Sequence, residues 1–478
     1  MKISRKNSKL LKAGSIGIIG TFLVKGMNFV SIPIFSRLLS TAEYGDASLY
    51  LTYLNIFTVT IGLALHGSVV RGMLEFKEKQ KQFLSSVLFL SLLNLLLYLI
   101  IGNAFVTPVS GALKMSPVVM NLLFLQAFAT FVVNFVSASL IYNYRYKENT
   151  LICFGSVFLS VVVSVLFILT IYKKDSYMGR IVGGAIPAIA ISFVIAMVIL
   201  LQGRTLIKKE YWKFSLGMSL PLILHLLANL ILAQSDKIMI VHYKGNYENG
   251  IYSLVYTVGI LLAALIEATN NIWMPWMFRK LEAKDYANIK KSSVWYIWAF
   301  NIVTLGVLTL APEIVKILGP KEYWVGIPCV IPVTLSTYFM FLYTIYVNIE
   351  FFKKKTKMIS IGTCMAAATN IGLNIYLIPR YGFEAAAYTT LVSYILLFLF
   401  HYVISRKMFA PIVYDFGAVI KGMAVIVVYS LGELYLFQFG NEGTLVWYGE
   451  RAILFVVTAF VVVLLTRKEI KTLLGFFK

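Results

Sequence analysis

Charged residues are scarce in this chain of 478 residues. They make up 13% of the sequence, whereas soluble domains contain about 25%. Hydrophobic residues make up 59%, and the mean hydropathy is +0.81. The composition excludes an ordinary soluble domain and predicts an all-α integral membrane protein.

Residues that bind metals or form disulfides are also few. The three cysteines lie far apart in apolar segments, which excludes a disulfide framework and a cysteine metal site. The histidines are equally scattered, so we expect no metal and no cofactor. These residues are Cys153, Cys329 and Cys364, and His66, His225, His242 and His401.

Motifs for the common energy sources and hydrolases are missing too. The sequence contains neither a Walker A motif nor HExxH. No predicted loop exceeds roughly twenty residues, which is too short for a soluble domain. We therefore expect no catalytic residues. Energy for any transport must come from an ion gradient, the membrane potential or the substrate's own gradient.

Long apolar runs fill most of the chain. A membrane-spanning helix needs about 20 mainly apolar residues, and we count fourteen candidates. The spans around Gly62, Pro328 and Val425 are the weakest. The approximate limits are 13–36, 46–66, 83–106, 118–142, 149–171, 180–202, 215–243, 250–274, 292–311, 326–350, 358–378, 383–404, 412–436 and 447–466.

The net charge of +22 follows the topology rather than one basic face. With both termini in the cytoplasm, the inner segments hold 30 of the 43 lysines and arginines and the outer loops hold 10. This bias is the positive-inside pattern. It argues against a nucleic-acid partner and predicts membrane lipids as partners at the inner, anionic leaflet.

An internal repeat divides the chain. Gly45 and Gly250 each open a similar Gly-x-x-Ser-Leu segment, and GRIVGGAI from Gly179 matches GFEAAAYT from Gly382 at nearly the same offset. An even repeat unit keeps both copies in one orientation. We predict an N-terminal lobe of six spans (1–203), a C-terminal lobe of six spans (204–407), and two additional spans with a basic tail (408–478).

Two predicted spans carry charges well inside them. The stretch 214–279 holds Asp236 and Lys237 in its first span and Glu267 in its second. A charge at the centre of a membrane helix costs about 2.5–3.5 kcal/mol on insertion scales. We therefore expect a water-filled cavity or a partner, with Asp236 and Glu267 as candidates for ion coupling. For Asp236, a purely structural role is equally open.

Helical spacing adds polar candidates. Thr21, Lys25 and Asn28 share a face of the first span, and His225, Asn229 and Asp236 share a face of the seventh. Lys25 lies about 18 Å into its span at 1.5 Å per residue. It either lines a cavity or pairs with a buried acid such as Asp236.

Other charged residues lie close to the ends of predicted spans. A histidine in the position of His225 more often packs between helices than takes part in coupling, and Arg71 fits a lipid contact or a headgroup entry site. Glu350, which precedes four lysines, is expected at the membrane interface.

Three runs in this order resemble the bacterial polysaccharide flippases of the Wzx type, which translocate O-antigen and capsule repeat units and are related to the multidrug and toxin extrusion (MATE) transporters. The runs are SIPIFSRLLSTAEYGDASLY (31–50), ILAQSDKIMIVHYKGNYENGIYSLVYTVG (231–259) with WMPWMFRKL after it, and FFKKKTKMISIGTCMAAATNIGLNIYLIPRYGFEAAAYTTLVSY (351–394).

The resemblance implies two six-helix lobes around a central cavity, plus two C-terminal helices, in the bacterial cytoplasmic (inner) membrane. It implies that an undecaprenyl-diphosphate-linked oligosaccharide moves from the inner to the outer leaflet by alternating access, alongside other polysaccharide-assembly proteins. Cationic cavity residues would meet the diphosphate or acidic sugars. Lys25 and Lys237 are the best matches, with Arg71, Asn28 and Asn229 beside them. Lys237 stands where many members have arginine, and lysine lacks the bidentate fork.

Two rivals stay open. An ion-coupled multidrug-type exporter of small molecules would share the architecture. A membrane polymerase or glycosyltransferase acting on the same lipid carrier would need a large outer loop, and no such loop is present. The residues identify neither the sugars nor a coupling ion.

Overall fold

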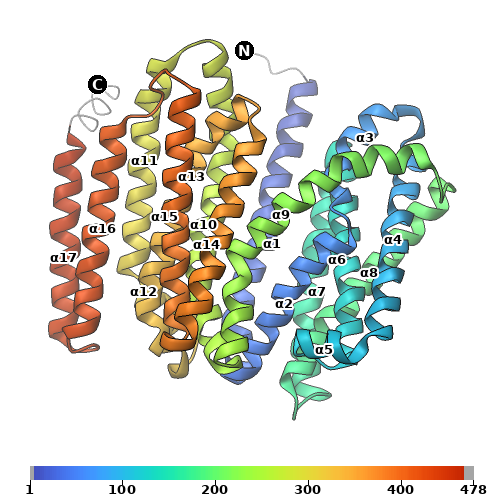
Figure 1. Ribbon diagram of the computed structural model, residues 1–478, viewed down its shortest axis with the longest axis horizontal. Helices are drawn as coiled ribbons and strands as arrows, with labels where there is room; N and C mark the ends of the chain where they lie inside the picture. Colours follow the sequence, from blue (N-terminus) through green and yellow to red (C-terminus); the bar gives the residue numbers. More distant parts are fainter. Residues whose placement is uncertain (1–4, 468–478) are drawn as a thin grey trace. The chain divides into compact units, whose positions relative to one another are not determined.

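A computed structural model describes residues 5–467, with side chains from residue 20 onward except that of His225 (Figure 1). The described residues form helices and no strand. The helices are α1 (Arg5–Leu38), α2 (Thr41–Ile61), η1 (Leu65–Ser68), α3 (Val69–Glu75), η2 (Lys77–Lys79), α4 (Gln80–Ala104), α5 (Val106–Leu113), α6 (Pro117–Tyr142), α7 (Tyr146–Thr170), α8 (Ser176–Gly203), α9 (Lys209–Tyr243), α10 (Asn246–Glu282), α11 (Tyr286–Thr309), α12 (Ala311–Leu318), η3 (Lys321–Cys329), α13 (Val330–Phe352), α14 (Thr356–Tyr381), α15 (Phe383–Met408), α16 (Phe416–Phe439) and α17 (Leu445–Leu465).

Twelve stretches of helix in the described residues are long and apolar enough to cross a membrane, or 13 if the bent pair of α2 with η1 and α3 is one span. The all-helical membrane fold is thus confirmed, whereas the count of fourteen is not. The bend of 49° follows Gly62, where Leu63 and Ala64 both have positive φ. Two successive left-handed residues interrupt an α-helix, which explains the weak apolar signal there.

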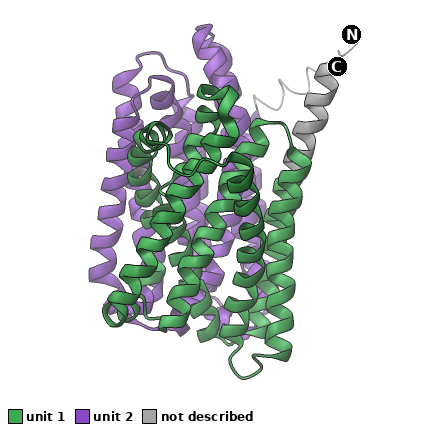
Figure 2. Ribbon diagram, turned by 90° about the vertical axis from the view of Figure 1, so that its right-hand side faces the viewer, with its two compact units in different colours: residues 1–238 green, residues 239–478 purple. Residues whose placement is uncertain are grey.

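The chain forms two compact units, residues 1–238 and 239–478 (Figure 2). The boundary between them falls within α9. The predicted division at 203 and 407 remains a prediction.

One contact between helix starts occurs in each unit. Glu43, in a capping box with Ser40 at the start of α2, accepts a hydrogen bond from the backbone N–H of Tyr177 at the start of α8 (3.2 Å). In the second unit, Glu248 at the start of α10 accepts one from the N–H of Phe383 at the start of α15 (3.0 Å). Both carboxylates satisfy a helix N-terminus, where free N–H groups favour negative charge. The same kind of contact thus occurs in each unit, and the predicted repeat remains a prediction.

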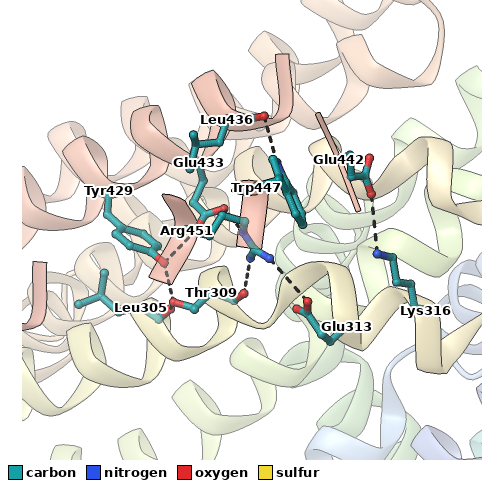
Figure 3. Close-up of polar contacts among 10 residues, drawn as sticks. All are labelled: Leu305, Thr309, Glu313, Lys316, Tyr429, Glu433, Leu436, Glu442, Trp447 and Arg451. Carbon is teal, nitrogen blue, oxygen red and sulfur yellow. Dashed lines mark hydrogen bonds and ion pairs between the residues drawn. The ribbon is translucent and has the colours of Figure 1, made fainter. Parts of the chain in front are cut away.

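In the second unit, one arginine joins the last two helices to the others (Figure 3). Arg451 on α17 donates through Nε to Glu433 on α16 (2.9 Å), and its Nη1 lies 3.6 Å from Glu313 on α12. It also donates to the backbone oxygen of Thr309 on α11. Tyr429 completes the cluster by donating to Glu433 (2.9 Å). Arg451 and Glu433 are almost fully buried, so each charge depends on the other.

We expect Arg451→Met to lower the melting temperature of the purified protein by several degrees. The change leaves the buried Glu433 charge without its partner, and breaking a buried pair costs about 3–5 kcal/mol. Arg451→Met with Glu433→Gln, which removes both charges, should recover part of the loss. Thermal unfolding in detergent measures this. Lys421→Met, an exposed change on α16, is the control, and equal melting temperatures for the Arg451 and Lys421 variants would contradict the prediction.

Candidate functional site

The first unit contains a cavity of about 310 Å³ among α1, α2, α6, α7 and α8. Its wall is apolar in part and carries many polar side chains. Arg180 is its one charged residue among the described side chains. The principal polar residues around the cavity are Asn28, Tyr50, Gln126, Asn134, Ser160 and Arg180.

Arg180 lies near the start of α8 and is only partly buried, because it borders the cavity. Its guanidinium carbon lies 3.8 Å from the ring centroid of Phe35 on α1. Its Nη1 donates to the hydroxyl of Ser164 on α7 (3.2 Å). No carboxylate of the described residues forms an ion pair with it. A ring face and one hydroxyl hold the guanidinium in place but do not neutralise it, so it can receive an anion.

Small residues bring α7 and α8 close together behind this arginine. Gly179 and Gly183 are spaced as in the Gly-x-x-x-Gly pattern that allows membrane helices to approach closely. A Cβ on Gly183 would lie 2.4 Å from the Cα of Ser164, so only glycine fits. Ser164 in turn donates to the backbone oxygen of Arg180 (3.0 Å). This close packing fixes the position of the Arg180 backbone.

Hydrogen bonds also fix three other polar side chains of the cavity wall. The Tyr50 hydroxyl on α2 donates to Oε1 of Gln126 on α6 (2.7 Å). Because this bond uses the amide oxygen of Gln126, its amide nitrogen can donate hydrogen bonds to another group. Ser160 on α7 donates to the backbone oxygen of Gly184 (3.0 Å). The wall thus combines the amide N–H donors of Gln126 with the Arg180 guanidinium, which suits an oxygen-rich, negatively charged ligand.

The second unit contains a buried polar network on α14 and α15. Asn374 on α14 donates to Asn370 (3.1 Å), and Asn370 donates to Thr390 on α15 (3.2 Å). Thr389 also donates to Asn374. All four side chains are buried.

Of the residues predicted from sequence, Asn28 borders the first-unit cavity. Lys25 lies one turn earlier on α1, is partly buried and does not border the cavity. Arg71 is exposed on α3, and Glu267 is exposed on α10 in the second unit.

The other predicted residues all lie on α9. Asp236 and Lys237 are buried, at 1% and 8% exposed. Asn229 is partly buried, and the side chain of His225 lies outside the described residues. Their roles in binding and coupling remain predictions.

Two residues were missed or misplaced. Arg180 was counted as an outer-loop cation because it begins the sixth apolar run. Two sequence features could have indicated that Arg180 lies between packed helices: the glycines around it and the serines at four-residue spacing on α7. Glu350 was expected at the interface, but it is fully buried against His401 on α15 (2.6 Å). Four lysines follow it in sequence, yet its own position on α13 faces the helix packing.

Comparisons with known proteins agree with this architecture. The chain resembles the structure titled "Lipid II flippase MurJ, inward closed conformation", with a TM-score of 0.68 and 16% identity, covering 95% of this chain and 99% of that one. It also resembles an inward-facing multidrug resistance MATE family transporter of the MOP superfamily, with a TM-score of 0.63 and 11% identity over 81% and 95% of the two chains. The fold is therefore MATE-like.

Sequence comparison gives the family. Residues 10–280 match the family described as "Polysaccharide biosynthesis protein", and the chain belongs to it. It is 24% identical over 378 residues to "Lsg locus putative protein 1" of Haemophilus influenzae, covering 74% of this chain and 87% of that protein. An uncharacterized membrane protein of the same organism is 25% identical over 388 residues, with 76% and 89% covered. The resemblance to polysaccharide flippases is thereby confirmed.

We expect the cavity to favour anions, and Cys153, which borders it on α7, allows a direct test. In a protein with Cys329→Ala and Cys364→Ser, an anionic methanethiosulfonate should modify Cys153 faster than a cationic one of similar size. A partly screened charge at this distance stabilises the anion by about 1 kcal/mol and destabilises the cation by a similar amount, so the ratio of the rates should be roughly 30-fold. Arg180→Gln should bring it close to one. The rates are measured by mass spectrometry, and Arg37→Gln, an exposed change on α1, is the control. A ratio that Arg180→Gln leaves unchanged would contradict an anion-selective cavity.

Proposed function

We propose that this protein is a flippase that moves undecaprenyl-diphosphate-linked oligosaccharide repeat units from the inner to the outer leaflet of the bacterial cytoplasmic membrane, for surface polysaccharide synthesis. The observation that carries the proposal is Arg180, a cation that borders a polar cavity within a membrane fold and has no acidic partner among the described residues. Membership of a polysaccharide biosynthesis family supports the substrate class. The fold shared with a lipid II flippase supports the reaction.

The chemistry of such a substrate fits the cavity. A diphosphate needs cationic and donor groups to replace its water, and the polyprenyl tail can remain in lipid. No covalent bond changes, so no catalytic residue is needed. Ligand pockets usually measure about 300–1,000 Å³. The cavity of about 310 Å³ would accommodate the diphosphate or one acidic sugar rather than the whole repeat unit.

Further residues complete the proposed path. Lys25, Lys237 and Arg71 add cationic groups, and Asn28 and Asn229 add amide groups for sugar hydroxyls. Asp236, Glu267 and His225 are the proposed coupling residues. Translocation proceeds by alternating access, with both termini in the cytoplasm.

An ion-coupled exporter of small molecules is the second candidate, because the fold is also that of multidrug resistance MATE transporters. Such a protein would give ion-dependent drug resistance on expression and leave lipid-linked glycans unchanged.

Depletion of the protein in its native cell should cause full repeat units on polyprenyl diphosphate to accumulate in the inner leaflet. Mass spectrometry of lipid extracts identifies the glycan, and an impermeant probe on spheroplasts reports the leaflet. No change in any lipid-linked glycan would reject the flippase and favour the exporter.

In the same assay we expect Arg180→Gln to reduce translocation by about 10- to 100-fold, because a hydrogen bond to a charged group contributes about 1.5–3 kcal/mol. Arg180→Lys should be intermediate, since it keeps the charge but loses the fork. Lys25→Ala and Lys237→Ala should also stop translocation without unfolding the protein. Arg37→Gln is the matched control. Normal surface polysaccharide in the Arg180→Gln strain would contradict the assigned role.

A further inference from the structure

A buried acid and a buried histidine meet in the second unit. Nδ1 of His401 on α15 lies 2.6 Å from Oε1 of Glu350 on α13, and both side chains are 0% exposed. A hydrogen bond of this length requires a proton between the two atoms. Neither residue has another ion-pair partner among the described residues. The pair therefore has to balance its own charge.

Two atoms of the pair have no partner. Oε2 of Glu350 and Nε2 of His401 are buried and make no hydrogen bond within the described structure. Buried polar atoms are normally satisfied, and each exception calls for an explanation. A purely structural tie between α13 and α15 would need only the first contact. The two free atoms indicate a site that takes up another group during function.

The surroundings of the pair are aromatic and tightly packed. The His401 ring lies 5.7 Å from that of Tyr343 and 5.3 Å from that of Phe400. On α14, a Cβ at Gly362 would lie 2.9 Å from Nε2 of His401. Nothing larger than hydrogen fits on Gly362, so water can reach Nε2 of His401 from this side only if α14 and α15 separate.

Neighbouring charges do not neutralise the pair. Tyr343, stacked on Tyr394, is the ionisable side chain in ring contact with it. Lys280 pairs with Asp285 and Lys290 with Asp415. The remaining charged residues at this end of α10, α11, α13, α14, α15 and α16 and their turns are exposed: Arg279, Glu282, Lys284, Lys291, Lys353, Lys354, Lys355, Lys357, Arg406, Lys407 and Lys421.

Charge balance fixes the number of protons. An ionised glutamate beside a protonated histidine is neutral overall, and so is a protonated glutamate beside a neutral histidine. Both forms hold the same single exchangeable proton, which belongs to the pair rather than to either residue. Losing it leaves a buried negative charge, and gaining a second leaves a buried positive charge. Either is costly inside a membrane protein, so the closed site retains one proton.

We propose that Glu350 and His401 form a proton-binding site that holds one proton while the second unit is closed and exchanges it with water when Oε2 and Nε2 become accessible. Release transfers the proton to water and leaves glutamate beside neutral histidine, and rebinding reverses the step. The site couples movement of the second unit to a proton gradient. This coupling rests on the proposed function, whereas proton binding itself does not.

The first test uses purified full-length protein in lipid nanodiscs. A pH-indicator dye in weakly buffered solution counts the protons released on a jump to alkaline pH, and infrared difference spectra follow the carboxyl group. Glu350→Gln with His401→Gln replaces the pair with neutral amides that can still hydrogen-bond. The wild type should release about one proton more per molecule than this variant.

Glu282→Gln with His242→Gln removes the same two residue types at exposed positions of this unit and is the matched control. It should leave the infrared signal of the buried carboxyl group unchanged. If the double amide variant fails to fold, as judged by its melting temperature, His401→Gln replaces it. That variant should shift the carboxyl band. Equal proton release and identical spectra in the wild type and the variants would overturn the site.

The second test separates coupling from the proposed function. Vesicles with an imposed pH gradient and no membrane potential are assayed for translocation of the accumulated lipid-linked glycan. The gradient should accelerate the wild type several-fold and accelerate the double amide variant clearly less, because that variant keeps only the coupling proposed for Asp236, Glu267 and His225; it should still translocate at equal pH. The same gradient response in both would overturn coupling. Absence of translocation in every protein would reject the proposed function and leave the nanodisc result to decide the site.

Discussion

A charged side chain inside hydrocarbon needs a partner, and this requirement organises the polar interior of the protein. Burying an ion without compensation costs several kcal/mol, so the fold must supply an opposite charge, a proton or water. Three places meet the requirement differently. Arg451 is neutralised by carboxylates, Glu350 shares a proton with His401, and Arg180 borders a cavity.

The two arginines differ in how many of their donors are already bonded, and this difference distinguishes a structural role from a binding role. Arg451 is 4% exposed, and its donors are directed at Glu433, Glu313 and a backbone oxygen. It has nothing left to offer a ligand, and it attaches α16 and α17 to the second unit. Arg180 has a ring face, one hydroxyl and open space. Arginine thus links helices in the second unit and is a candidate binding group in the first.

Much of the fold could be predicted from hydropathy, because each span is a long apolar run with backbone bonds satisfied internally. The break after Gly62 was anticipated only as a weak span, since positive φ at Leu63 and Ala64 leaves no clear mark in composition. Asn28 was found at the cavity because helical spacing places it on a polar face. Predicting the spans and the position of Asn28 requires only the sequence of one helix at a time and its 3.6-residue period.

Contacts between helices were harder to predict. From the sequence, Arg180 looked like a loop residue because it stands at the start of an apolar run. A count of charges in loops does not show which residues in the first turns of a helix lie inside the protein. The spacing of Gly179 and Gly183 indicates close packing against the serines of α7. That pattern is informative only when both helices are considered together. Glu350 was misplaced for a similar reason: the lysines that follow it suggested an interface, whereas its partner, His401, lies 51 residues away.

The two units share one contact between helix starts and differ in their buried charged residues. Glu43 and Glu248 each hold the start of a later helix by its backbone N–H, a contact that depends little on side chains and so can survive divergence. Inside, the first unit carries Arg180, whereas the matching stretch GFEAAAYT has no cation. The second unit carries the Glu350–His401 pair instead. A repeat of two identical halves could bind one ligand twice. Halves that differ in this way can bind an anion in one and a proton in the other, which is what coupled translocation of an anionic substrate requires.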